Sequence, residues 1–213
     1  MYRMSIRISN DLSVISGRVS TRPTRPAMRE RYDRRRAEVV LGAASVFAER
    51  GYDQTSVPEL AEALGLAAGS LYHYFGSKEQ LLRAICDQLM DPLLEQAEAL
   101  AADPREPAEQ LRALVRLWVE HVVAHRDHML VFQQERHVIE RGAAWKGVRD
   151  SRKAFERLAE DALARADAGG KDPRLALSAL LGMVNHTAQW YRPRGRLDAT
   201  EIADGYVDLV LGA

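Results

Sequence analysis

Tyrosine, histidine and lysine side chains gather in one short stretch, LAAGSLYHYFGSK. If this stretch is helical, Leu71 and Phe75 are four residues apart and share the face that turns inward. Tyr72 and His73 then fall off that face, and their hydroxyl and imidazole groups can donate to phosphate oxygens. Lys78 stands in the first turn of the next predicted helix, where free N–H groups favour an anion. These residue types and spacings fit either a surface for a polyanion or a helix that shows amphipathic tyrosines to solvent or to a partner protein.

Charge is distributed unevenly along the 213 residues. The chain has 30 Lys and Arg against 30 Asp and Glu, so its formal net charge is zero. Residues 1–78 nevertheless carry a net +4, and residues 79–213 a net −4. This division favours a phosphate-binding head on a body with another task, although many unrelated proteins divide charge as unevenly.

Composition is ordinary for a globular protein, with 46% hydrophobic and 28% charged residues. No apolar run reaches the roughly 18 residues of a membrane helix, and we find no secretory signal. Cys86 is the single cysteine, which fits a reducing compartment. We expect a cytoplasmic protein that does not associate with membranes.

Apolar residues recur at spacings of three and four from about Arg31 almost to the end, and no stretch alternates like a strand. Ser56 and Ser77 predict helix starts, because Glu or Gln follows each of them three residues later. One helix is expected over residues 127–141. The predicted fold is all-α, with about nine helices.

Two short helices with a tight turn at Gly65 between them have the layout of a helix-turn-helix. We expect a flexible basic arm at 1–30, a helix-turn-helix domain at 31–78 and a helical body at 79–213. The arm either lies along a DNA groove or is a non-functional extension upstream of a start at Met28, and we prefer the second interpretation.

The run GYDQTSVPELAEALGLAAGSLYHYFGSKEQLL closely resembles the DNA-binding domain of TetR-family transcriptional repressors, over about Arg34 to Leu82. The resemblance implies a repressor that binds a palindromic double-stranded DNA operator as a homodimer and is released by a small-molecule effector. It implies no cofactor and no catalytic residues. The DNA-binding residues that follow from it are Ser56, Ala68, Gly69, Ser70, Tyr72, His73, Tyr74 and Lys78.

The residues at the starts of the two short helices differ from those of the tetracycline repressor. Ala68 and Gly69 offer no polar side chain for a base, and Pro58 replaces a side chain often used for base contact. We therefore expect phosphate contacts, methyl contacts and groove shape to outweigh bidentate base readout.

The family likeness places an effector pocket and a dimer interface in the body. Small-molecule sites combine aromatic area with a few polar groups, although core packing is the alternative for each candidate. The last two predicted helices are the dimer candidates, because one of them interleaves small residues with Leu and Met, and the alternative is that both are ordinary core helices. The pocket candidates are Trp118, His121, Phe132, Trp145, Phe155, Met183, His186 and Trp190.

Three body histidines, His121, His125 and His128, raise the question of a metal. The first two share a helix face, but no Cys or carboxylate cluster completes a site in the sequence. We therefore predict no metal site.

The segment HTAQWYRPRGRLDATEIADGYVDLVLG resembles the end of a TetR subgroup that responds to acyl-CoA thioesters. Arg192, Arg194 and Arg196 either pair with CoA phosphates or form a solvated basic turn. The effector expected is hydrophobic or acyl-CoA-like, with a lipid-like molecule lacking CoA as the alternative.

Two other functions are compatible with an all-α chain: a helical enzyme, and an interaction module that does not bind DNA. Against an enzyme, the sequence has no Walker motif, no strand leading into a Gly-rich turn and no evident nucleophile–base pair.

Overall fold

The computed structural model describes residues 26–166 and 170–212, and all regular structure within them is helical. The all-α prediction is confirmed. Ten α-helices and one 3-10 helix are present in the described residues, where about nine helices were expected. None of these helices is long and apolar enough to cross a membrane. The elements are α1 (Pro26–Arg50), α2 (Val57–Ala63), α3 (Ala68–Phe75), α4 (Lys78–Ala102), α5 (Pro107–Ala124), α6 (Arg126–Gln134), α7 (Arg136–Arg141), η1 (Ala143–Trp145), α8 (Lys146–Arg165), α9 (Pro173–Trp190) and α10 (Ala199–Leu211).

Two boundaries differ from the sequence-based expectation. The helix expected over 127–141 is divided into α6 and α7 at Glu135. The arm expected at 1–30 is helical from Pro26, because α1 begins five residues before Arg31. A proline fits the first turn of a helix, where its missing N–H has no intrahelical partner. Residues 1–25 of the expected arm lie outside the described residues.

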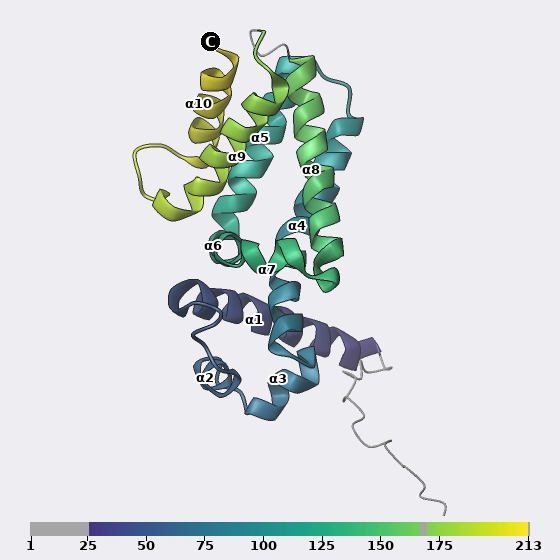
Figure 1. Cartoon of the computed structure of the whole chain (residues 1–213), viewed down its shortest axis with the longest axis vertical. Coiled ribbons are helices and arrows are strands. Elements are labelled where there is room, and N and C mark those ends of the chain that lie inside the picture. Colours follow the sequence, from purple (N-terminus) through teal and green to yellow (C-terminus); the bar gives the residue numbers. More distant parts are fainter. Residues whose placement is uncertain (1–25, 167–169, 213) are drawn as a thin grey trace, which may run out of the picture.

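Helices α1, α2 and α3 form a head at one end of the molecule, around a core that includes the buried side chains of Phe47, Leu60, Leu71 and Phe75 (Figure 1). Ser56 caps α2 in a capping box with Glu59, so this helix starts where the sequence predicted. Gly65 adopts a φ of 62° after α2, a left-handed conformation that glycine adopts without a steric penalty. The turn therefore directs the chain sharply from α2 into α3.

The Ser56 cap allows a first test. Replacing Ser56 with Ala is expected to lower the free energy of unfolding by about 1 kcal/mol, because a donor at the start of α2 loses its acceptor. Chemical denaturation followed by circular dichroism measures the change. Ser178→Ala is the control, because this exposed hydroxyl bonds only within α9, to Arg174 O. Equal stability of the two variants would contradict a capping role.

The body contains α5 to α10, and the long α4 runs into it from the head (Figure 1). Within it α4 packs against α8, and α5 packs against α10. Helix α1 contacts both α4 and α6, so the head meets the body through two helices. Movement of α4 or α6 would therefore act directly on α1 of the head.

Helix α4 contains Pro92 but continues through it. A proline has no N–H, so the carbonyl of Gln88 loses the donor it would have four residues on. The neighbouring carbonyl of Leu89 lies 2.7 Å from Nε2 of His121 on α5. Because a carbonyl only accepts, Nε2 carries the proton. His121 thus supports the weakened turn of α4 from the side.

Candidate functional site

The recognition face comprises α3 together with the starts of α2 and α4. Tyr72 is 48% exposed, and it lines a shallow recess together with Lys78, between α2, α3 and α4. Lys78 is the first residue of α4, and the Nζ of this lysine lies 4.1 Å from the ring centroid of Tyr52. Ser77 caps α4 by accepting a hydrogen bond from the N–H of Gln80 at 3.1 Å. The lining of the recess therefore includes Tyr72 and Lys78, while the ammonium of Lys78 lies over the Tyr52 ring.

The other aromatic residues of α3 lie against α1. The ring of Tyr74 is half-buried, and its centroid is 5.1 Å from that of Tyr32. His73 is exposed, with its ring 5.8 Å from the same tyrosine. Tyr74 thus contacts the N-terminal half of α1, whereas Lys78 reaches the opposite end of that helix through Tyr52 and Phe47.

The start of α3 is sterically open. Gly69 is exposed, and a Cβ placed on it would have no heavy atom of the described residues within 4 Å beyond its chain neighbours and the backbone of its own helix. The protein's own packing therefore does not require glycine here. Ser70 follows in the first turn of α3 and is partly exposed, and Ser56 is exposed at the start of α2.

A cavity of about 500 Å³ lies within the body, between α4, α5, α6, α8 and α9. Its volume is that of a small-molecule site. Trp118 and Phe155 form part of the wall, with their ring centroids 4.9 Å apart in an edge-to-face arrangement. The lining residues are Met90, Leu93, Trp118, Met129, Phe132, Gln133, Arg136, Arg152, Phe155, Glu156, Ser178, Leu181, Gly182, Asn185 and His186.

Four of the eight pocket residues expected from the sequence line this cavity: Trp118, Phe132, Phe155 and His186. The other four do not. His121 is buried, and its Nε2 is bonded to the carbonyl oxygen of Leu89. Trp145 is buried in η1. Met183 lies on α9 beside the cavity lining, and Trp190 is 43% exposed at the end of α9. These four residues are therefore not among the effector contacts that we propose.

The cavity also has a charged wall that sequence periodicity did not identify. Arg152 donates to Glu156 at 2.9 Å and pairs with Glu140 at 3.0 Å. Its Nε is buried and has no hydrogen-bond partner among the described residues. A buried unpaired donor is costly. Arg136 adds a second guanidinium to the same lining.

The three histidines considered as metal ligands have other partners. His125 stacks on His121 with centroids 4.2 Å apart, and its Nδ1 lies 3.0 Å from His121 O. His128 Nε2 lies 3.3 Å from Oε1 of Gln88. Burial first, and then the neighbouring His125, lower the pKa of His121 and of His128 to about 4. Both rings are therefore neutral at pH 7.

Two family descriptions match the chain. Residues 40–85 match "Bacterial regulatory proteins, tetR family", and residues 104–213 match "Tetracyclin repressor-like, C-terminal domain". The HTH-type transcriptional repressor KstR2 of Rhodococcus jostii (strain RHA1) is 30% identical, over 83% of this chain and 89% of that protein.

Solved structures agree with this assignment. AibR in complex with isovaleryl coenzyme A and operator DNA is 31% identical, with a TM-score of 0.70 over 83% of this chain and 98% of that one. The ketosteroid transcriptional regulator KstR2 of Mycobacterium tuberculosis is 28% identical, with a TM-score of 0.76 over 84% of this chain and 93% of that one. The chain belongs to the TetR family and is a DNA-binding transcriptional regulator, not an enzyme.

Proposed function

We propose that this protein is a repressor that binds a palindromic operator as a homodimer and is released when an acyl-CoA-like effector enters the body cavity. The observation that carries the effector half is the cavity itself, with its aromatic wall and two arginines, Arg136 and Arg152, in its lining. Relatives named as repressors, and a structural neighbour bound to isovaleryl coenzyme A and operator DNA, support the same assignment.

The operator is contacted through the head, which we place at residues 26–78, with the body at 79–213. Tyr72 and Lys78 anchor phosphates from the two edges of the recess, and Ser56 adds a hydroxyl at the start of α2. The open space at Gly69 lets the duplex approach α3 closely, with Ala68 beside it. Ser70 and His73 then lie near base edges, and Tyr74 takes part through its packing on α1.

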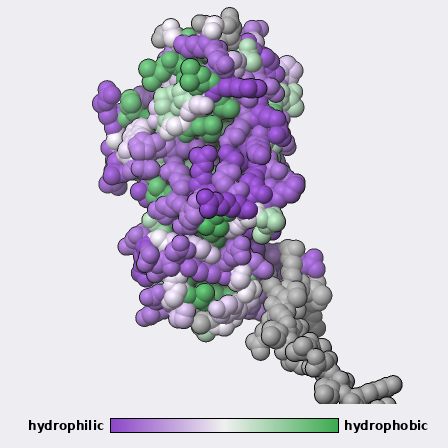
Figure 2. All heavy atoms as spheres, in the orientation of Figure 1, coloured by the Kyte–Doolittle hydropathy of each residue, from purple (hydrophilic) through white to green (hydrophobic). Residues whose placement is uncertain are grey.

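The homodimer forms through α9 and α10. Leu175 on α9 is 69% exposed and Leu209 on α10 is 71% exposed, and these are the two most exposed large apolar side chains of the described residues. Figure 2 shows hydrophobic surface gathered over this part of the body. Exposed small residues nearby, among them Ala179 and Gly205, allow helices of two copies to approach closely. A two-fold pair supplies the two heads that a palindrome requires.

Effector binding is the part of the function that a direct experiment tests best. We expect isovaleryl-CoA or a longer acyl-CoA to release fluorescent operator DNA, drawn from the intergenic region upstream of the gene, in an anisotropy assay. Free CoA, which lacks the apolar part, is expected to leave the complex intact. If neither acyl-CoA thioesters nor the corresponding free acids release the DNA, the effector assignment is wrong.

Arg152→Lys is the variant for this assay. It keeps the positive charge but loses the planar set of donors, so about tenfold more effector should be needed for release. Operator affinity without effector should not change. Arg157→Lys is the matched control, because Arg157 is exposed on the same helix and does not line the cavity.

A further inference from the structure

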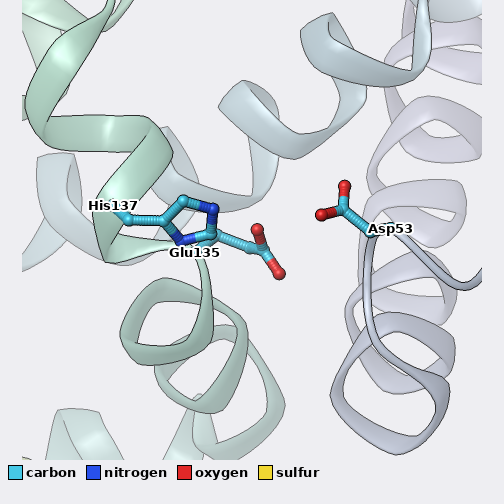
Figure 3. Close-up of side chains that lie close together, drawn as sticks. All are labelled: Asp53, Glu135 and His137. Atoms are coloured by element: carbon cyan, nitrogen blue, oxygen red, sulfur yellow. The ribbon is translucent and has the colours of Figure 1, made fainter.

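Two carboxylates and an imidazole converge where the head meets the body. Asp53 belongs to the turn after α1, Glu135 joins α6 to α7, and His137 is the second residue of α7. One ligand atom from each residue lies within 4.8 Å of the other two. In Figure 3 the carboxylates of Glu135 and Asp53 point toward each other across the gap, with the His137 ring beside Glu135. None of these residues belongs to the recognition face or the cavity lining.

Glu135 is the unusual member of this cluster. It is only 6% exposed, and its Oε2 is buried with no hydrogen-bond partner among the described residues. Burial first, and then the charge of Asp53, raise the pKa of its carboxyl. A buried carboxylate that faces a second carboxylate is costly unless a cation or a donor compensates it.

The nearby lysine does not remove this cost by direct pairing. Lys78 lowers the pKa of Glu135 through its charge, but its ammonium lies over the Tyr52 ring at 4.1 Å. No ion pair described for these residues joins Lys78 to Glu135. The charges of His137 and then Lys78 lower the pKa of the Glu135 carboxyl, but neither group forms a described ion pair with it.

We propose that Asp53, Glu135 and His137 bind a divalent first-row transition-metal ion, of which Zn²⁺ is the prototype, that links the head to the body. Two carboxylate oxygens and one imidazole nitrogen are ligands typical of such ions, whereas Mg²⁺ and Ca²⁺ prefer oxygen alone. Water fills the remaining position or positions.

The geometry needs only a small adjustment. At metal–ligand distances of about 2.1 Å, tetrahedral ligands lie about 3.4 Å from one another. Asp53 and His137 are both exposed, so their side chains can rotate toward the more fixed Glu135. An ion held by all three would tie the turn after α1 to the α6–α7 junction, in the arrangement seen here. Gln133 and Arg136 on either side of the α6–α7 junction line the cavity, so the ion would lie close to the cavity wall.

Tag-free full-length protein titrated with Co²⁺, a spectroscopic substitute for Zn²⁺, tests the site. We expect one ion per chain, visible absorption bands and displacement by Zn²⁺ but not by millimolar Mg²⁺. Asp53→Asn and His137→Gln should each weaken binding by about tenfold or more, because each removes a direct ligand. Glu49→Gln is the control: it removes an exposed charge close by on α1 and should stay within about twofold of wild type.

Bridging has its own signature. Zn²⁺ should slow hydrogen exchange of the backbone amides in the turn at residues 51–55, and the His137→Gln variant should lose this protection. If Co²⁺ binds weakly at several places, if Mg²⁺ competes equally, or if both ligand variants bind like Glu49→Gln, the proposal is overturned. These measurements use neither DNA nor effector, so they fail or succeed separately from the proposed repressor function.

Discussion

Replacing Leu209 with Arg is expected to convert the protein into a monomer and to weaken operator binding by about 100-fold or more. In an isologous dimer the substitution occurs twice, so two apolar contacts are lost and two guanidinium groups are placed in the interface. Burying a leucine contributes about 1.5–3 kcal/mol, whereas burying an unpaired charge is strongly unfavourable. A single head then contacts one half-site only, and specific affinity falls accordingly.

Light scattering gives the mass and fluorescence anisotropy gives the operator affinity. Leu41→Arg is the matched control, because Leu41 is also highly exposed, at 63%, but lies on α1 in the head. That variant should keep the dimer mass. Should Leu209→Arg remain a dimer with normal affinity, α10 is not in the interface.

Lys78→Ala is expected to weaken binding to operator and to random DNA alike, by about tenfold or more for the dimer. Each head loses one charged contact to a phosphate, and hydrogen bonds to charged groups contribute about 1.5–3 kcal/mol. The slope of log affinity against log salt concentration should fall by about two, because each dimer neutralises two fewer phosphates. A uniform loss on both DNAs separates a phosphate contact from a base contact.

Lys153→Ala is the control for this experiment. Lys153 is exposed on α8 in the body, so the variant removes the same charge far along the sequence from the recognition face. It should leave the salt slope unchanged. A variant at Lys78 that kept the wild-type slope would show that this ammonium does not reach the DNA backbone.

Tyr72→Phe should also weaken binding to operator and to random DNA alike. The loss of affinity should be smaller than for Lys78→Ala, and the salt slope should not change.

Local signals in the sequence were sufficient for the starts of α2 and α4. The capping serines Ser56 and Ser77 marked the starts of α2 and α4, because hydrogen bonds at a helix start involve residues only three apart. Leu71 and Phe75 were correctly expected to face inward, since both are buried.

Features that depend on distant segments were not accessible in this way. The break at Glu135 carries no proline or glycine, so the apolar pattern continued across it and indicated one helix. Arg152 was not predicted to line a pocket, because an arginine on an amphipathic helix is usually solvated. Only the structure shows the cavity beside it. Asp53 meets Glu135 only through the packing of α1 on α6, which no spacing in the sequence encodes.

The junction between α6 and α7 has a consequence for anyone who would use this protein as a biosensor. Gln133 and Arg136 line the cavity, while their neighbours Glu135 and His137 approach the head, so one short segment serves two surfaces. Mutating this segment so that the cavity accepts a new analyte would therefore also change its contact with the head, and with it the response on DNA. Phe155 on α8 and Leu181 on α9 line the same cavity from helices other than α6 and α7, and they are the positions at which we expect that ligand preference can be redesigned while the DNA response is kept.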